Sequence, residues 1–264
     1  MATKTPRFID KKAGQTLVHF DEYASEISFR FIPTNLRAWR AIQTPYARIS
    51  ANIPLLSSTL ERLNTAFPSD TKFLKSHSEI ITRIPRMSTL SIGALINHAV
   101  SEMSPDRMFL NIGIWHGFTL ISGILNNPDK PAMGVDNFSQ FGGPKDSFTQ
   151  IFQEVRSSMH QFVDMDFRDY FFNKHKGEIG VYVYDGPHTR KDQLDALELA
   201  DGFLAEGSVV FIDDTNWEDS RSATLEFVES HGNSYRIILD IRTGSNAHPT
   251  FWNGLMVLQK TSRP

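Results

Sequence analysis

The chain has 264 residues, with 27 Lys and Arg against 30 Asp and Glu, and it contains no cysteine. Its length allows one large domain, or one domain with an extension. A chain without cysteine cannot form disulfides, thiolate zinc sites, iron–sulfur clusters or a cysteine nucleophile. The net charge of −3, the lack of a long apolar run and the polar N-terminal residues predict a cytoplasmic protein with no nucleic-acid partner and no membrane partner.

The first 85 residues differ in charge from the rest of the chain. They hold 12 Lys and Arg and 7 Asp and Glu, whereas the remainder holds 15 and 23. Between Ile27 and Leu60 there are four arginines and no acidic residue. The ordinary interpretation is a solvated face. The alternative is a patch for an anionic substrate or for the acidic part of a neighbouring subunit.

Apolar residues in this first part recur at helical spacing between Pro54 and Pro68. They are Leu55, Leu56, Leu60, Leu63 and Phe67. A second short helix is expected over 73–81, before Pro85. We interpret residues 1–85 as a helical extension, either a lid or an oligomerisation arm, and residues 86–264 as the main domain.

Helices and strands alternate after Ser88. The predicted strands cover 108–112, 132–135, 161–163, 178–184, 208–212, 235–241 and 255–258. The predicted helices cover 88–100, 118–125, 146–159, 189–205 and 217–230. This alternation predicts an α/β fold with a Rossmann-like, doubly wound, mostly parallel seven-stranded sheet. The last two strands follow each other without a helix, so we expect the last one to insert antiparallel.

The segment from Phe109 to Gly117 predicts a strand that runs into a Gly113-x-x-x-Gly117 turn and then a helix. Glycine tolerates φ > 0 and lets the backbone come close to a ligand. At the end of the first strand of an open α/β sheet, such a turn usually serves a nucleotide-like cofactor. The Gly-x-Gly-x-x-Gly pattern that seats a pyrophosphate is missing here, which disfavours a nicotinamide dinucleotide.

Polar side chains follow most of the predicted strands at the carboxyl end, which faces the ligand in a doubly wound sheet. The set is Asn111, Asp136, Asp166, Asp185 and the pair Asp213-Asp214. Asp136 is placed to accept hydrogen bonds from a ribose diol, and Asp166 from an adenine amino group. For each, a helix-capping or turn aspartate is the alternative. Trp115 and Trp217 are expected to wall the pocket, with ordinary core packing as the alternative.

Adjacent strand ends would bring the carboxylates of Asp185, Asp213 and Asp214 together. Close carboxylates repel unless a cation or a proton intervenes, and oxygen-rich clusters prefer hard ions such as Mg²⁺. The alternative is that Asp213 or Asp214 caps the following helix. His188, three residues after Asp185, is a candidate general base because its ordinary pKa lies near neutrality. A structural or solvated histidine is the alternative.

These motifs resemble those of the class I S-adenosylmethionine (SAM)-dependent methyltransferases. Over residues 83–260 the chain resembles the metal-dependent small-molecule O-methyltransferases, including the macrocin O-methyltransferase-like group. The family's first motif has an acidic residue where this chain has Asn111. The resemblance implies that Asp185, Asp213 and Asp214 hold a divalent metal and that His188 is the base. The residues predicted to bind the cofactor are Asn111, Gly113, Trp115, Gly117, Asp136, Asn137, Asp166 and Asp185.

The sequence therefore predicts an enzyme that transfers a methyl group from SAM to a hydroxyl of a small molecule, with Mg²⁺ assisting. The acceptor would be a sugar, a polyketide or a phenolic compound. His188 and Asp185 are the predicted catalytic residues, and a homodimer through residues 1–85 is the predicted assembly. Two alternatives stay open: a methyltransferase-fold binding protein without turnover, and an NAD-dependent oxidoreductase.

Overall fold

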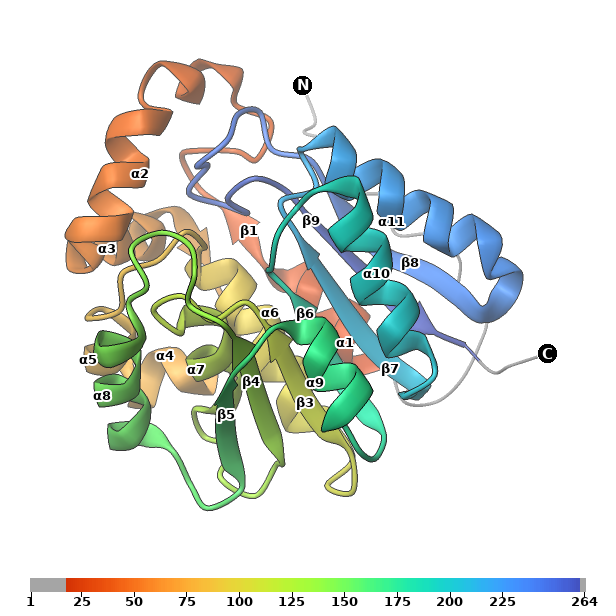
Figure 1. Cartoon of the computed structure of the whole chain (residues 1–264). Helices are drawn as coiled ribbons and strands as arrows, with labels where there is room; N and C mark the ends of the chain where they lie inside the picture. The colour runs from red at the N-terminus through yellow and green to blue at the C-terminus, as the bar shows by residue number, and fades with distance from the viewer. Residues whose placement is uncertain (1–17, 262–264) are drawn as a thin grey trace.

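A seven-stranded sheet forms the centre of the computed structural model, which describes residues 18–261 (Figure 1). Its strands are β3 (Met108–Ile112), β4 (Ala132–Asp136), β5 (His160–Asp164), β6 (Ile179–Tyr184), β7 (Leu204–Asp213), β8 (Tyr235–Ile241) and β9 (Leu255–Lys260). They lie in the order β5-β4-β3-β6-β7-β9-β8. β9 pairs antiparallel with both β7 and β8, and the other pairs are parallel. The predicted sheet, including the antiparallel last strand, is confirmed.

Helices cover both faces of this sheet. They are α6 (Leu90–Glu102), α7 (Phe118–Ile124), α8 (Lys145–Val155), α9 (Phe167–Asn173), α10 (Arg190–Asp201) and α11 (Glu218–Ser230). Successive side chains of a strand point to opposite faces. Thus Val181 and Val183 of β6 join an apolar cluster with α6, α7 and α8, whereas Tyr182 and Tyr184 join a second cluster with α9, α10 and α11. Burial on both faces explains why the strand bodies are continuously apolar.

Several elements differ from the sequence prediction. α9 (Phe167–Asn173) was not predicted. The helix predicted over 189–205 ends at Asp201, and Leu204 instead pairs with Ile179 in the sheet. The helix predicted over 73–81 is two short helices, α4 (Lys72–Ser76) and α5 (Ser78–Ile81). Element ends of this kind depend on pairing with distant strands, which overrides local pattern.

The extension before α6 packs on the main sheet. It contains α1 (Val18–Glu26), β1 (Ser28–Phe29), a 3-10 turn η1 (Arg37–Ala41), α2 (Gln43–Asn52), α3 (Pro54–Asn64) and β2 (Thr65–Ala66). Trp39 Nε1 donates a hydrogen bond to the carbonyl of Ala247, at 2.9 Å, in the loop between β8 and β9. Trp39, Tyr46 and Trp252 also belong to the apolar cluster that reaches β6. Residues 1–17 of the predicted extension lie outside the described residues, and its boundary at residue 85 stays a prediction.

His248, in the loop between β8 and β9, makes stability depend on pH. It is buried, its Nδ1 lies 2.8 Å from Thr250 Oγ1, and burial lowers the pKa of His248 to about 4. In the unfolded chain the pKa is about 6.5. The unfolded state therefore takes up this proton first on acidification. We expect the free energy of unfolding to fall between about pH 6.5 and 4, by about 3 kcal/mol from this group.

Urea unfolding of the normal protein and of a His248→Gln variant at pH 7 and pH 5 checks this expectation. The variant lacks the titrating group, so it should lose less stability between the two pH values. An equal loss in both proteins would contradict the assignment, whatever the variant costs at pH 7.

Between residues 18 and 261, no helix has the length and apolar character needed to cross a membrane.

Candidate functional site

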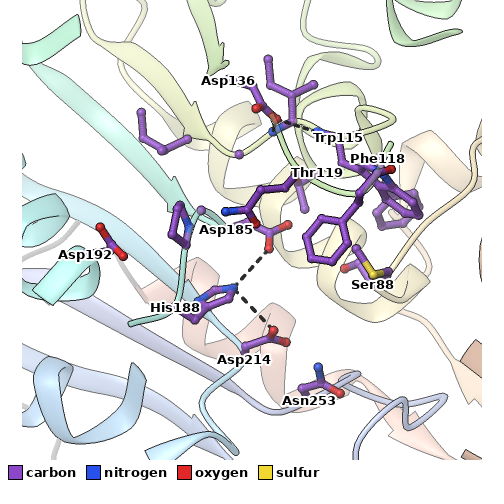
Figure 2. Close-up of a pocket in the computed structure, with 18 of the residues that line it drawn as sticks. Ser88, Trp115, Phe118, Thr119, Asp136, Asp185, His188, Asp192, Asp214 and Asn253 are labelled. Carbon is purple, nitrogen blue, oxygen red and sulfur yellow. Dashed lines mark hydrogen bonds and ion pairs between the residues drawn. The ribbon is translucent and has the colours of Figure 1, made fainter. Parts of the chain in front are cut away.

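A cavity of about 780 Å³ opens at the carboxyl ends of β3, β4, β6 and β7 (Figure 2). Small-molecule and cofactor sites commonly have volumes of about 300–1,000 Å³. Eight predicted site residues line it: Gly113, Trp115, Asp136, Asn137, Asp166, Asp185, His188 and Asp214. Three others, Asn111, Gly117 and Asp213, do not line it. Asp136 and Asp185 therefore face one cavity, as a shared cofactor and acceptor site requires.

Asp136 anchors the loop between β3 and α7. Its Oδ2 accepts hydrogen bonds from the backbone N–H groups of Ile114, at 2.7 Å, and Trp115, at 2.9 Å. Its Oδ1 accepts one from the N–H of Phe138, at 2.7 Å. A carboxylate accepts about four hydrogen bonds, so capacity is left for a ligand hydroxyl. The contact of Asp136 with a ribose stays a prediction. Holding the loop in place is a second role of this carboxylate.

The two glycines of the loop are needed for packing against the protein itself. Gly113 has φ +81°, and a Cβ there would lie 1.9 Å from the carbonyl oxygen of Asp185. Gly117 has φ +93°, and its Cβ would lie 2.5 Å from the ring of Phe148. The sequence suggested that these glycines admit a ligand. The structure shows that they also admit the backbone of Asp185 and a side chain of α8, and their predicted contact with a ligand stays a prediction.

Asn111 also holds the loop between β3 and α7. It is buried, and its Nδ2 donates a hydrogen bond to the carbonyl of Gly113 at 2.6 Å. A carboxylate has no donor, so an ionised Asp could not make this contact. The asparagine that departs from the family motif is thus explained by the local backbone.

Removing the Asp136 carboxylate should loosen the loop and weaken cofactor binding. Hydrogen bonds to a charged group are each worth about 1.5–3 kcal/mol, in part replaced by water. For Asp136→Ala we expect the Kd for SAM to rise about 10- to 100-fold. Asp164, at the end of β5, supplies a matched control because its exposed carboxylate pairs with Lys145 at 2.7 Å. Calorimetric titration should show Asp164→Ala unchanged; equal losses in both variants would contradict the anchoring role.

Asp166 and Asn137 lie on the same side of the cavity as Asp136. Asp166 is the N-cap of α9, where its Oδ1 accepts a hydrogen bond from the N–H of Arg168 at 2.9 Å. The helix-capping alternative is therefore realised for Asp166, and its predicted adenine contact stays a prediction. Asn137 accepts hydrogen bonds from Ser139 through its Oδ1.

The imidazole of His188 lies between two carboxylates, as Figure 2 shows. Its Nε2 is 3.4 Å from Asp214 Oδ2 and 3.8 Å from Asp185 Oδ1. Burial by itself lowers the pKa of His188, but the two carboxylates outweigh it and hold that pKa above its ordinary value. The site therefore stabilises the protonated imidazole.

Burial raises the pKa of each carboxylate in this group. The pKa of Asp214 is raised to about 6, and that of Asp185 is raised although His188 opposes the shift. For Asp213, burial and the nearby charge of Asp185 raise the pKa well above the ordinary value. α11 begins after Trp217 without a side-chain cap, so the alternative that Asp213 or Asp214 caps this helix is wrong.

The carboxylates match a magnesium site in chemistry but not in arrangement. The Oδ1 atoms of Asp213 and Asp214 are buried without a hydrogen-bond partner, and a bound cation would satisfy such oxygens. Asp213, however, does not line the cavity, and His188 lies between the other two carboxylates. Within the described part of the chain, no group of three or more His, Asp or Glu is placed so that it could hold a metal ion.

The sequence did not point to the far wall of the cavity. α2 supplies Gln43, Thr44 and Ala47, and the approach to α6 supplies Met87 and Ser88. Ser88 Oγ is buried without a hydrogen-bond partner. These residues carry no recognisable motif, and only the packing of the extension brings them to the site.

Two tryptophans complete the wall near His188. Trp217 lies edge-on to the imidazole, with ring centroids 5.4 Å apart, and Trp252 comes from the loop between β8 and β9. Trp115 and Trp217 both line the cavity, as the sequence predicted.

Comparisons with known proteins agree with this architecture. Residues 110–215 match a family model described as a methyltransferase domain. An O-methyltransferase of Streptomyces achromogenes involved in tomaymycin synthesis, TomG in complex with SAM, is 12% identical, with 85% of this chain and 98% of that chain covered and a TM-score of 0.52. An O-methyltransferase of Bacillus cereus in complex with SAH is 10% identical, with 85% and 99% covered and a TM-score of 0.50. A protein of Corynebacterium glutamicum is 12% identical, with 79% and 91% covered and a TM-score of 0.54. A comparison with curated proteins found no match.

The strand order and the cavity at the strand ends define the class I methyltransferase fold. The resemblance of this chain to the class I SAM-dependent methyltransferases is thereby confirmed, with residues 110–215 matching the model of a methyltransferase domain. At these low identities the solved structures show the fold alone. The narrower resemblance to the macrocin O-methyltransferase-like group stays a prediction.

Proposed function

We propose that this protein transfers the methyl group of SAM to a hydroxyl of a small molecule. The observation that carries the proposal is His188, which lies in the cavity between Asp185 and Asp214. A hydroxyl is a poor nucleophile at neutral pH and needs a base that accepts its proton. An imidazole between two carboxylates suits this role, because the carboxylates stabilise the imidazolium that forms.

The cavity offers separate surfaces for donor and acceptor. SAM would lie along the loop that Asp136 holds, with Asp166 and Asn137 farther along the same wall. The acceptor would lie between α2, Trp217 and Trp252. We propose a sugar, a polyketide or a phenolic compound as acceptor, since this wall combines aromatic rings with the side chains of Gln43 and Thr44.

In the proposed reaction the acceptor oxygen attacks the methyl carbon of the sulfonium. The new C–O bond forms as the S–C bond breaks, which leaves a methyl ether and S-adenosylhomocysteine (SAH). The hydroxyl proton passes to the neutral imidazole of His188. The rest of the acceleration comes from aligning the two reactants in one cavity.

Mg²⁺ assistance stays a prediction. A divalent ion would need the carboxylates of Asp185 and Asp214, which contact His188 in this structure. We therefore derive no step through a metal. Titration with Mg²⁺, and activity with EDTA present, test this part separately from methyl transfer.

Calorimetric titration with SAM, SAH and NAD, with and without Mg²⁺, is the experiment that tests the function. Release of SAH is then followed with a panel of hydroxylated sugars, polyketides and phenolic compounds. We expect SAM and SAH to bind and at least one acceptor class to release SAH. Binding of NAD in place of SAM would support the oxidoreductase alternative, and SAM binding without release by any acceptor would support the binding protein.

A further inference from the structure

The carboxylate of Asp214 lies in a conformation that its own segment does not favour. Asp214 follows the end of β7 with a φ of +56°, a backbone conformation that residues other than glycine adopt only at a cost. Its Oδ2 lies 3.4 Å from His188 Nε2, and its Oδ1 is buried without a hydrogen-bond partner. Such a conformation persists where the surrounding structure imposes it. The orientation of this carboxylate therefore depends on residues that are distant in the chain.

The loop between β8 and β9 brings Asn253 to Asp214, and Figure 2 shows the two side chains next to each other. Asn253 lines the cavity and is 7% exposed. Its backbone is tied to the segment that carries Asp214, because the N–H of Asn216 donates a hydrogen bond to the carbonyl of Asn253 at 2.6 Å. A Cβ on the next residue, Gly254, would lie 2.9 Å from the backbone nitrogen of Asn216. The two segments are thus in close contact, which keeps Asn253 beside Asp214.

A contact with Ala247 orients the side-chain amide of Asn253. Its Oδ1 accepts a hydrogen bond from the N–H of Ala247 at 2.7 Å. Because the amide oxygen is used in this way, the NH₂ group, which only donates, is the part left for Asp214. A donor beside Asp214 favours the ionised carboxylate, and it opposes the rise that burial causes in the pKa of Asp214. Asn253 therefore stabilises the negative charge that lies next to His188.

The N-terminal extension reaches the same place through Ala247. Trp39 is buried, and its Nε1 donates to the carbonyl of Ala247 at 2.9 Å. Ala247 has a φ of +46°, which is again unfavourable for a residue with a side chain. Its carbonyl is held by the extension and its N–H by Asn253. Hydrogen bonds therefore link Trp39 to Ala247 and Ala247 to Asn253, which lies beside Asp214.

We propose that Asn253 is a positioning residue whose amide holds the Asp214 carboxylate against His188, and that Trp39 supports Asn253 through Ala247. The proposal rests on the proposed function, because the position of Asp214 affects turnover only where His188 accepts the proton of the acceptor. Asn253 acts through Asp214 and needs no contact with the reacting atoms. The extension then contributes to the geometry of the base as well as to the wall of the cavity.

Asn253→Asp separates a positioning role from a purely structural one. An ionised aspartate still accepts the N–H of Ala247, so the loop keeps its hydrogen bond, but it has no donor for Asp214. We expect kcat to fall about 10- to 100-fold, while the Kd for SAM stays within about threefold. Asn173→Asp is the matched control, because it makes the same change at the exposed end of α9 and should leave kcat unchanged.

Steady-state kinetics with an acceptor from the SAH-release screen, together with calorimetric titration of SAM, measure these effects. Unchanged kcat in Asn253→Asp, or an equal loss in Asn173→Asp, would overturn the proposal. A loss of SAM affinity as large as the loss of kcat would also overturn it, because a general disturbance of the cavity affects binding and turnover together. Circular dichroism of both variants checks that they fold.

A second readout needs no acceptor. The side-chain amide signals of Asn253 are recorded by NMR of the ¹⁵N-labelled protein and are identified by their loss in Asn253→Asp. We expect Asp214→Ala to shift them, because it removes the acceptor of the amide. Trp39→Phe should shift them as well, because it keeps a ring but removes the donor to the loop. Tyr235→Phe is the control, since it removes a side-chain donor at the opposite end of β8 and should leave the signals in place.

The two readouts distinguish this proposal from the proposed function. Amide signals that do not move in Asp214→Ala, or that do not move in Trp39→Phe, would overturn the positioning role. If the normal protein released no SAH with any acceptor, the proposed function would fall, and shifted amide signals would still establish the contact between Asn253 and Asp214.

Discussion

Replacement of His188 by alanine is expected to lower kcat about 10²- to 10⁴-fold, the usual contribution of a positioned general base. The affinity for SAM should change little, because the loop held by Asp136 is separate from His188. The two carboxylates that contact the imidazole, Asp185 and Asp214, would remain in the cavity without a base between them. Steady-state kinetics with an acceptor from the SAH-release screen, together with calorimetry, separate the effect on turnover from the effect on binding.

His116 offers a matched control for this experiment. It lies in the loop between β3 and α7 but does not line the cavity, and its Nδ1 contacts Ser147 Oγ at 2.8 Å. His116→Ala should keep kcat within about threefold. Unchanged turnover in His188→Ala, or an equal loss in both variants, would remove His188 from the proposed chemistry.

The second large effect concerns the buried ion pair between the extension and the main domain. Glu61→Ala should lower the free energy of unfolding by about 3–5 kcal/mol, because it leaves the buried Arg86 guanidinium without its counter-charge. The N–H of Leu90 and the Tyr46 hydroxyl would lose their acceptor at the same time. Urea unfolding monitored by circular dichroism measures the loss.

An exposed ion pair supplies the comparison. Arg83 and Glu154 make two hydrogen bonds of 2.9 Å with each other, but their side chains are 50% and 39% exposed. Glu154→Ala should cost far less stability than Glu61→Ala, because water and salt screen an exposed pair. The double variant Glu61→Met with Arg86→Met should recover most of the stability lost in Glu61→Ala, since it removes both charges. A double variant as unstable as Glu61→Ala would show that the pair is not the source of the effect.

The sequence predicted the polar residues at the strand ends, because a strand and the residue that follows it are set by neighbouring positions in the chain. β3 and β8 have the predicted bounds, and Asp136, Asp185 and Asp214 follow or end strands as expected. Parallel strands bring their carboxyl ends to one edge, so a list of polar ends already predicted one cavity. The roles of individual residues were less readable. Asp213 and Asp214 are adjacent in sequence, yet only Asp214 lines the cavity. Asp213 is the last residue of β7, whereas Asp214 lies beyond the strand with a φ of +56°, so its side chain does not follow the alternation of the strand.

The extension was the part least accessible to sequence analysis. The leucine spacing between Pro54 and Pro68 correctly predicted a helix, but spacing alone does not say which side of a helix is buried. The partner of Glu61 is Arg86, 25 residues away, and Trp39 donates to Ala247, 208 residues away. Contacts between residues so far apart in the chain produce no repeating pattern in the sequence, so they could not be predicted from it.

The sequence by itself determined the α/β class, the positions of the main strands and the gathering of carboxylates at one edge of the sheet, because alternation and burial act over a few residues. Only the tertiary structure decided that α2 closes the cavity, that His188 lies between two carboxylates and that α3 shows its leucines to solvent. Those features depend on contacts between segments that are distant in the chain, and such contacts form only when the whole sheet is assembled.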